Sequence, residues 1–445
     1  MLRTLAKGKD LVRWAGAMNH FQLRNGELYC ENVPLAQIAR KIGTPVYVYS
    51  TATMCRHVTA LSEALEGLSD PLIAYAVKAN PNSAVIASLA KAGLGADVVS
   101  GGEYRRARAA GVPPDKIVFS GVGKTEEEMR LALEGGLFQF NLESLSEAEM
   151  LSGVATTMGR TAPVGFRINP DVGAGGHAKI TTGAAENKFG IAIGGALDAY
   201  SHIAGLPGLI VQGVAVHIGS QLTSLDPLER AFIRVGELIA DLRAAGHEIN
   251  IADLGGGLGV PYDLDQPPPP SPEQYGAMVR RIAGGWNARL VFEPGRLIVG
   301  NAGVLLSRVI RVKPGTADPF VIVDAAMNDL MRPALYDAWH RIEAVRPNGR
   351  ERTANVVGPV CETGDTFATA RRMDEVAAGD LIIFRTAGAY AAAMSNSYNS
   401  RPLTPEVLVD GDRWAVVRPR IDIDRLIGGD RVPDWLSGCA GASSS

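Results

Sequence analysis

Between residues 71 and 296, short apolar runs alternate with longer stretches in which apolar residues recur at helical spacing. The runs are rich in β-branched and aromatic residues and apolar on both faces, which is typical of parallel strands covered by helices. They lie at residues 72–77, 96–99, 116–120, 138–141, 164–168, 211–217, 250–254 and 289–293. Eight strands with crossover helices in about 250 residues predict an α/β fold of the (β/α)₈ TIM-barrel type. A doubly wound open sheet is the alternative.

The pattern changes after residue 301, where strand-like runs are separated by turns with little helix between them. These runs lie at residues 303–312, 319–325, 353–360, 380–387 and 406–419. They predict an antiparallel β-sandwich or β-barrel domain. Near the N-terminus, Asn25 and Gly26 form a turn signal between two short strand-like pieces, so we expect this segment to complete the β domain. The expected division is a barrel at 48–300, a β domain at 18–47 and 301–436, and flexible ends at 1–17 and 437–445.

Composition and charge exclude several classes of protein. Of the 445 residues, 46% are hydrophobic and 20% are charged, which is ordinary for a globular protein. Lys and Arg number 44 against 47 Asp and Glu, a net charge of −3, so no strong field favours nucleic acid or an anionic membrane. No apolar run approaches the roughly 20 residues that span a bilayer. The basic N-terminus lacks the apolar region of a secretory signal.

The cysteines indicate a reducing compartment. The chain has four, Cys30, Cys55, Cys361 and Cys439, scattered over its whole length. This spacing is no disulfide framework, and no Cys-x-x-Cys pair indicates a metal site. We therefore expect a cytoplasmic protein without a bound metal.

Polar and charged residues stand where the predicted strands end. The active sites of such barrels form at the carboxyl ends of the strands, so these residues are expected to converge on one mouth. A purely structural interpretation predicts unrelated small polar residues there, not one lysine, one histidine, one arginine and several carboxylates. In chain order the residues are Lys78, Asp97, Ser120, Asn141, Arg167, His217, the glycines after Asp253, and Glu293.

Lys78 ends an apolar strand and precedes Ala-Asn-Pro. A lysine desolvated in such a pocket loses pKa and becomes a Schiff-base nucleophile. The alternative is a lysine whose aliphatic stem covers the barrel rim. His217 has a similar alternative, since a lone histidine at a strand end is often merely hydrogen-bonded.

A glycine-rich turn, Gly255-Gly256-Gly257-Leu258-Gly259, follows the seventh predicted strand. Val260 breaks a dinucleotide fingerprint, and no Gly-Lys-Ser/Thr follows for a Walker loop. The turn is either an ordinary tight turn or, as in many barrels at this place, a phosphate site. Glu293, in the sequence Glu-Pro-Gly-Arg, could keep a pyridine nitrogen protonated or form a surface ion pair.

These residues carry a resemblance to a known family. The sequences at 75–80 (YAVKAN), 217–220 (HIGS), 255–259 and 293–296 (EPGR) resemble the fold-type III pyridoxal-phosphate-dependent decarboxylases. Within them the chain is most similar to the diaminopimelate decarboxylase branch, from about residue 18 to residue 436. The segments typical of that branch are 177–183, 186–190, 332–336, 361–363 and 388–390. Thr181 stands where the family more often has Ser.

The resemblance implies a role for each matching residue. Lys78 binds pyridoxal 5'-phosphate covalently, Glu293 pairs with its ring nitrogen, and His217 stacks on the ring. Catalysis would use Lys78 together with Cys361. The implied phosphate residues are Ser220, Gly257 and Arg296, and the other implied cofactor contacts are Asp97, Arg167, Gly255, Gly256, Gly295 and Tyr390. The implied substrate residues are Arg296, Arg332, Tyr336, Glu362 and Tyr390. Cys361 and Glu362 would arrive from the second subunit of a homodimer with shared active sites.

The implied reaction is the decarboxylation of meso-2,6-diaminopimelate to L-lysine and CO₂, the last step of lysine biosynthesis. Recognition of the distal end of this small-molecule substrate needs a cation and an anion, which Arg332 and Glu362 supply. Read alone, Arg332 could equally be a surface residue of the β domain, and Cys361 an apolar filler. The alternatives are an ornithine, arginine or carboxynorspermidine decarboxylase, or a non-catalytic regulatory paralogue that binds the cofactor. Alanine racemase shares the two-domain plan but has no use for Glu293.

Overall fold

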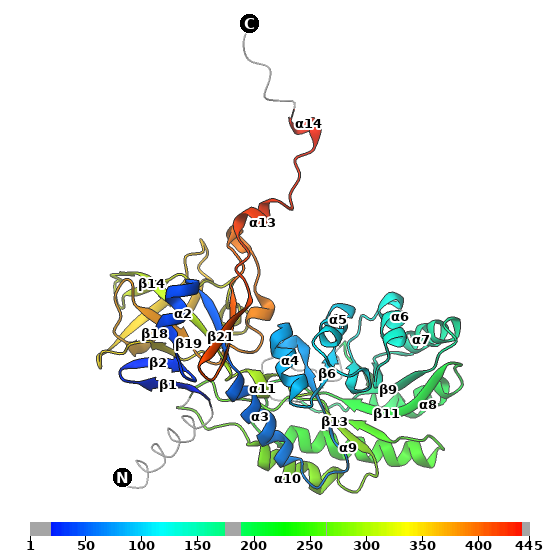
Figure 1. Ribbon diagram of the computed structural model, residues 1–445. Coiled ribbons are helices and arrows are strands. Elements are labelled where there is room, and N and C mark those ends of the chain that lie inside the picture. The colour runs from blue at the N-terminus through cyan, green and yellow to red at the C-terminus, as the bar shows by residue number, and fades with distance from the viewer. Residues whose placement is uncertain (1–18, 174–187, 264, 438–445) are drawn as a thin grey trace, which may run out of the picture.

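The computed structural model describes residues 19–173, 188–263 and 265–437. They form two parts that lie side by side (Figure 1). One part is a parallel barrel with helices around it, and the other is built mainly of β-sheet. Of the expected flexible ends at 1–17 and 437–445, only Ser437 is among the described residues. Residues 177–183, 186 and 187 of the family-specific segments also lie outside them.

Eight parallel strands close the barrel. The strands are β5 (Leu72–Ala76), β6 (Gly95–Val98), β7 (Ile117–Phe119), β8 (Gln139–Leu142), β9 (Ala162–Asn169), β11 (Leu209–Val216), β12 (Ile251–Asp253) and β13 (Arg289–Phe292). Each pairs with the next, and β13 pairs back to β5. This closure confirms the predicted barrel and excludes the open sheet. A short strand, β10 (Ile191–Ala192), adds to β9.

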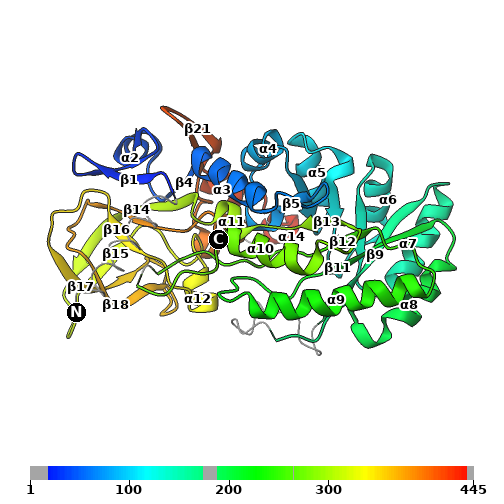
Figure 2. The same cartoon turned by 90° about the horizontal axis from the view of Figure 1, so that it is seen from below.

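Helices cover the outside of the barrel (Figures 1 and 2). They are α3 (Thr51–Ala64), α4 (Ser83–Lys91), α5 (Gly101–Ala109), α6 (Glu126–Gly135), α7 (Leu145–Thr157), α8 (Ala196–Ala204), α9 (Asp226–Ala244) and α10 (Pro272–Ala283), with single turns η1 (Val77–Ala79), η2 (Pro114–Lys116) and η4 (Ile193–Gly195). Local sequence sets where they begin. The Thr125 hydroxyl accepts from the N–H of Glu128, whose carboxylate binds the N–H of Thr125 in return.

The two-residue period of the strands places apolar side chains at the bottom of the barrel interior and functional groups at its top. A small apolar cluster inside the barrel contains Leu72, Ala74, Val118, Ile251 and Val291. Positions two residues further along these strands share the same face. They bring Ser120, Asp253 and Glu293 to the mouth, and Lys78 stands in the turn η1 that directly follows β5.

The second part is a mixed β domain. Its strands are β4 (Val46–Ser50), β14 (Gly303–Lys313), β15 (Phe320–Val323), β16 (Ile342–Ala344), β17 (Glu351–Val357), β18 (Thr366–Asp374), β19 (Leu381–Phe384), β20 (Glu406–Asp410) and β21 (Arg413–Arg418). The order of the main path is β18-β17-β15-β14-β4-β20-β21, with β19 between β14 and β16. Most pairs are antiparallel, but β15 with β17 and β4 with β20 are parallel. The expectation of a purely antiparallel sheet is corrected there, because long connections rather than hairpins join these strands.

The N-terminal segment packs into this domain. Its strands β1 (Phe21–Arg24) and β2 (Glu27–Cys30) form the predicted hairpin, with positive φ at Asn25 (50°) and Gly26 (77°). After β3 (Val33–Pro34), helix α2 (Leu35–Ile42) follows. Residues of this segment share one apolar cluster with strands of the second sheet, among them Phe21, Leu35, Val304 and Ile383. The N-terminal segment therefore completes the β domain, as expected.

Loops of the β domain reach the mouth of the barrel. The N–H of Tyr390 donates to the carbonyl of Ala79 at 2.8 Å. The side-chain amide of Asn80 donates to the carbonyl of Gly388 at 3.1 Å. These bonds hold Tyr390 close to Lys78, although more than 300 residues separate them in the chain. The remaining elements here are α11 (Arg296–Val299), α12 (Arg332–Tyr336), η5 (Ala392–Met394) and η6 (Tyr398–Ser400).

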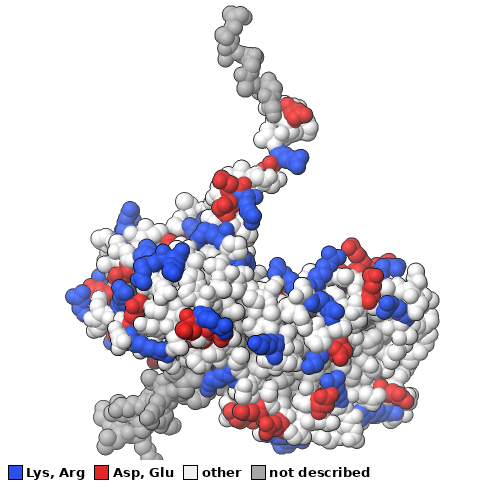
Figure 3. All heavy atoms as spheres, in the orientation of Figure 1, with Lys and Arg blue, Asp and Glu red and all other residues white. Residues whose placement is uncertain are grey.

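Two observations concern membranes and surface charge. Among the described residues, no helix has the length and apolar content needed to cross a membrane. On the face drawn in Figure 3, basic and acidic side chains are both scattered among neutral areas. The last described elements, α13 (Ile423–Ile427) and α14 (Asp434–Ser437), extend away from the body (Figure 1).

Candidate active site

A cavity of about 360 Å³ opens at the carboxyl ends of the barrel strands. Its lining includes six of the residues that end the predicted strands: Lys78, Ser120, Asn141, Arg167, His217 and Glu293. Asp253 and Phe189 also line it. The convergence expected from the strand ends is therefore observed for these residues.

Lys78 and Asp97 form an ion pair in this cavity. The Nζ atom of Lys78 lies 2.6 Å from Oδ2 of Asp97, whose side chain is fully buried. Burial lowers the pKa of Lys78, but Asp97 and Glu293 raise it by more, and the net shift is upward. The expected lowering of the pKa of Lys78 by desolvation is therefore wrong, because a buried carboxylate stabilises the ammonium form.

Three buried carboxyl groups belong to this site. Besides Asp97, they are Asp253, 1% exposed, and Glu293, 7% exposed. Burial raises the pKa of Asp253 to about 6. Burial, the charge of Asp253 and a hydrogen bond between the two carboxyls raise the pKa of Glu293 well above its ordinary value. The shift in the pKa of Glu293 therefore favours its neutral form over the carboxylate.

Neutral polar side chains fix the carboxyl cluster. The side-chain amide of Asn141 donates to Asp253 at 2.8 Å and to the hydroxyl of Ser120 at 3.1 Å. The N–H of Gly255 donates to the other carboxylate oxygen of Asp253 at 2.9 Å. The hydroxyl of Ser120 lies 3.4 Å from Glu293. Asp253, Asn141 and Ser120 belong to the site although the sequence resemblance assigns them no role.

His217 is a neutral ring at the same mouth. Burial, with further contributions from Arg167 and Lys78, holds the pKa of His217 well below its ordinary value. Its Nδ1 accepts a hydrogen bond from the N–H of Gly256 at 3.2 Å. Arg167 donates to Glu143 at 3.2 Å and its guanidinium lies 4.6 Å from the centre of the Phe189 ring.

The glycine-rich turn passes between neighbouring strand ends with no room for side chains. A Cβ on Gly255 would lie 2.4 Å from the carbonyl oxygen of Val216, and one on Gly256 would lie 2.2 Å from that of Glu293. The N–H groups of Gly255 and Gly256 already donate to Asp253 and His217. The turn thus offers fewer N–H groups to an anion than the sequence indicates. Gly257, with φ of 116°, is the residue of the three whose N–H group suits an anion.

Arg296 and Ser220 lie next to this turn and complete a site for an anion. The guanidinium of Arg296 donates to the hydroxyl of Ser220 at 3.2 Å. Within the described part of the chain, the buried Nε atom of Arg296 has no hydrogen-bond partner. An unsatisfied buried cationic donor beside a glycine turn fits a phosphate group. The residues present therefore fit pyridoxal phosphate: a lysine, a buried carboxyl group and a histidine line one cavity, and an anion site lies beside the glycine turn.

Tyr390 and Gly295 bring the β domain against Arg296. The guanidinium of Arg296 lies 4.7 Å from the centre of the Tyr390 ring. A Cβ on Gly295 would lie 3.4 Å from the hydroxyl of Tyr390 and 3.0 Å from Ala79. A side chain at residue 295 would therefore crowd Tyr390.

Arg332 lies buried beside Arg296 rather than on the surface. Its side chain is 6% exposed, and its guanidinium lies 4.5 Å from the centre of the Tyr262 ring. Burial lowers the pKa of Arg332, and nearby Arg296 lowers it further. The nearby Tyr336 acts in the opposite direction and raises the pKa of Arg332. Sequence reasoning missed Tyr262 because it stands in a loop with no motif.

Cys361 and Glu362 are exposed and do not line the cavity. They lie in the loop between β17 and β18, where the carboxylate of Asp365 accepts from the N–H groups of Met327 and Val360. Glu362 accepts a hydrogen bond from the hydroxyl of Tyr398 at 3.0 Å. The chain therefore does not itself bring Cys361 to Lys78.

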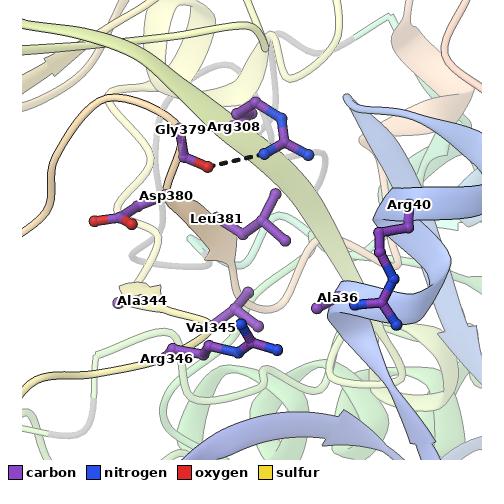
Figure 4. A pocket seen from close by; sticks show the side chains of 9 residues that line it. All are labelled: Ala36, Arg40, Arg308, Ala344, Val345, Arg346, Gly379, Asp380 and Leu381. Carbon is purple, nitrogen blue, oxygen red and sulfur yellow. Dashed lines mark hydrogen bonds between the residues drawn. The ribbon is translucent and has the colours of Figure 1, made fainter.

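A second cavity, of about 250 Å³, lies in the β domain between α2, β14 and β19 (Figure 4). Arg40, Arg308 and Arg346 line it, and Arg308 donates to the carbonyl of Gly379 at 2.8 Å. It contains no lysine and none of the residues singled out by the sequence. The barrel mouth is therefore the candidate active site.

The barrel part matches a known family. Residues 51–300 match the family described as pyridoxal-dependent decarboxylase, pyridoxal binding domain. The fold and the site thus define a pyridoxal-dependent decarboxylase, and its cofactor is pyridoxal phosphate.

Similar proteins show which pyridoxal-dependent decarboxylases this chain is related to. A diaminopimelate decarboxylase of Zymomonas mobilis is 55% identical over 418 residues, which is 94% of this chain and 99% of that protein. One of Pseudomonas fluorescens is 49% identical over 93% of this chain and 99% of that protein. The solved structure of diaminopimelate decarboxylase from M. jannaschii in co-complex with L-lysine is 35% identical, with a TM-score of 0.90 over 94% of this chain and 99% of that chain. The chain belongs to the diaminopimelate decarboxylase family.

Proposed function

We propose that the protein decarboxylates meso-2,6-diaminopimelate to L-lysine and CO₂. The observation that carries this proposal is the buried guanidinium of Arg332, which stands beside Arg296 and Tyr390 at the mouth that holds Lys78. A buried cation at this place suits a substrate with a second carboxylate. The names and identities of the relatives support the same substrate.

The residues that would hold pyridoxal phosphate are Lys78, by its amine, Glu293, at the ring nitrogen, His217, against the ring face, and Ser220, Gly257 and Arg296, at the phosphate. When bound, the cofactor supplies a conjugated ring that accepts the electron pair left behind by CO₂. Burial and the charge of Asp253 raise the pKa of Glu293 well above its ordinary value. At this place its carboxyl group would hold a proton at the ring nitrogen and stabilise the positive charge there.

The distal end of the substrate would be recognised by residues from two chains. Arg332 offers a planar fork for the distal carboxylate, and Glu362 offers a charge for the distal ammonium. Glu362 and Cys361 are exposed in the single chain and are not part of the cavity lining. We propose that they enter the site of a second copy in a homodimer. Cys361 would then return a proton to the carbon from which CO₂ departs.

The alternatives make different demands on the distal pocket. A substrate such as ornithine has no distal carboxylate and would leave Arg332 buried without a counter-charge, which is costly. A non-catalytic paralogue has no need for Lys78, Glu293 and Arg332 together. We also propose a cytoplasmic location, which the unpaired Cys30, Cys55 and Cys361 support.

A panel of substrates tests the proposal. CO₂ release is measured for meso-diaminopimelate, D-lysine, L-ornithine and L-arginine with the purified holoenzyme. D-lysine is the matched control, because it equals meso-diaminopimelate without the distal carboxylate. We expect kcat/KM for meso-diaminopimelate to exceed that of the other three by at least about a hundredfold. Equal or greater kcat/KM for ornithine or arginine would overturn the proposal.

A further inference from the structure

His340 is a buried histidine in direct contact with Arg332. Its side chain is 1% exposed, and it lies in the segment between α12 and β16. Its Nδ1 lies 2.8 Å from the carbonyl oxygen of Arg385, and its Nε2 lies 2.9 Å from a guanidinium nitrogen of Arg332. No sequence motif indicated this residue.

The two partners fix the tautomer of His340. A carbonyl oxygen only accepts, so Nδ1 must carry the proton. A guanidinium only donates, so Nε2 must be the unprotonated acceptor. Burial, together with the charges of Arg332, Arg296 and Arg371, lowers the pKa of His340 to about 3. The ring therefore stays neutral, and its lone pair faces Arg332 throughout the working range of pH.

Tyr262 also contacts the guanidinium of Arg332. The guanidinium of Arg332 lies 4.5 Å from the centre of its ring, and that of Arg296 lies 5.7 Å from it. The ring of His340 meets the Tyr262 ring edge-on, at 5.3 Å and 87°. The hydroxyl of Tyr262 accepts from Arg296 at 2.5 Å. Tyr262 thus lies between two guanidinium groups that would otherwise repel each other.

We propose that His340 is a positioning residue that orients Arg332 and thereby sets the preference for a substrate with a distal carboxylate. The inference rests on the proposed function and extends it. One N–H of Arg332 is used by His340, so the plane of the guanidinium is fixed while its other donors can meet both oxygens of a carboxylate. An arginine that rotates freely would lose this conformational freedom when the substrate binds. The entropy cost would lower the affinity for the substrate.

Variants of His340 test this role. His340→Phe keeps the ring volume but removes both hydrogen bonds. We expect its KM for meso-diaminopimelate to rise about tenfold, as for the loss of a charge-assisted hydrogen bond, while kcat changes less than about twofold. Its KM for D-lysine should change little, because D-lysine has no distal carboxylate. The selectivity between the two substrates should fall accordingly.

A pair of similar substitutions at residue 340 separates the loss of one hydrogen bond from misfolding. The amide oxygen of His340→Gln can reach the position of Nε2 and accept from Arg332, whereas the shorter His340→Asn cannot. We expect Gln to restore most of the affinity for L-lysine, measured by calorimetry on the holoenzyme, and Asn not to. His202→Gln is the matched control, because His202 is exposed on α8.

The outcomes separate the two claims. Equal rises in KM for both substrates, a fall in kcat alone, or equal affinities for Gln and Asn would overturn the role of His340. A wild-type enzyme that does not turn over meso-diaminopimelate would instead overturn the proposed function. Cofactor absorbance is recorded for every variant, and it should match the wild type, because His340 contacts Arg332 and not the cavity around Lys78.

Discussion

The amine of Lys78 lies 2.6 Å from the carboxylate of Asp97, which is itself fully buried at the end of the neighbouring strand β6. The two strands β5 and β6 are paired in register, with Ala76 beside Asp97, so the barrel itself sets this contact. Its effect is to raise the pKa of Lys78 and so to stabilise the ammonium form of its side chain. A protonated amine is not a nucleophile, so attachment of an aldehyde cofactor requires that proton to leave.

Asp97→Asn should make the attachment of the cofactor possible at lower pH. Asp97 raises the pKa of Lys78 and burial lowers it, so without the carboxylate the pKa of Lys78 falls. The rate at which pyridoxal phosphate absorbance develops on the apoprotein should then reach its half-maximum at a pH lower by about 1–3, the range for one close opposite charge. Asp115→Asn, an exposed residue in η2, is the control. An unchanged or higher midpoint would show that Asp97 does not govern Lys78.

Glu293→Gln should lower kcat much more than it lowers cofactor affinity. The amide cannot become the carboxylate that stabilises a protonated ring nitrogen as negative charge develops on the substrate. We expect a loss in kcat of at least about a hundredfold, the scale of removing one preorganised electrostatic contact. Cofactor affinity is measured by titration of absorbance, with the exposed Glu127→Gln on α6 as control. Similar kcat for Glu and Gln would reduce Glu293 to a structural residue.

Arg332→Ala should raise KM for meso-diaminopimelate and reduce the preference over D-lysine. The loss of a charge-assisted bidentate contact costs roughly 1.5–3 kcal/mol, or about 10- to 150-fold. Steady-state kinetics on both substrates provide the measurement. If selectivity between the two substrates is retained, Arg332 does not contact the distal carboxylate.

The sequence predicts most of this site because strand periodicity is local. The alternation that buries Ile251 and Val291 also directs Asp253 and Glu293 to the mouth, and Lys78 follows the end of β5 directly, in η1. The direction of the Lys78 pKa could not be predicted, because it depends on how closely Asp97 approaches across two strands. Tyr262 and His340 escaped prediction for a similar reason: each stands in a segment without periodicity, and only the tertiary fold brings both against Arg332.

The β domain was predicted less completely. Strand β18 has a polar sequence, with Arg371 and Arg372 in its middle, so hydrophobic pattern gave no signal for it. Strand β16 has only three residues. The parallel pairing of β4 with β20 joins segments more than 350 residues apart, and no local pattern carries that information.

Subunit exchange tests whether two chains build one site. Lys78→Ala and Cys361→Ala dimers should each be inactive, but their heterodimer has one site with both residues intact. Random exchange of equal amounts makes half of the dimers mixed, so activity should recover to about a quarter of the wild-type sites. Labelled subunits verify that exchange occurs. Complete exchange without recovery would mean that Cys361 acts within its own chain or not at all.

The central claim is that this barrel mouth converts meso-diaminopimelate to L-lysine with Lys78 as the nucleophile. The most direct measurement is a mass balance: CO₂ and L-lysine are quantified together as the purified holoenzyme consumes the substrate. We expect equal amounts of both products with the wild type and neither with Lys78→Ala, while Lys91→Ala, an exposed lysine at the end of α4, behaves as wild type. Consumption of substrate without CO₂, or undiminished lysine formation by Lys78→Ala, would contradict the account.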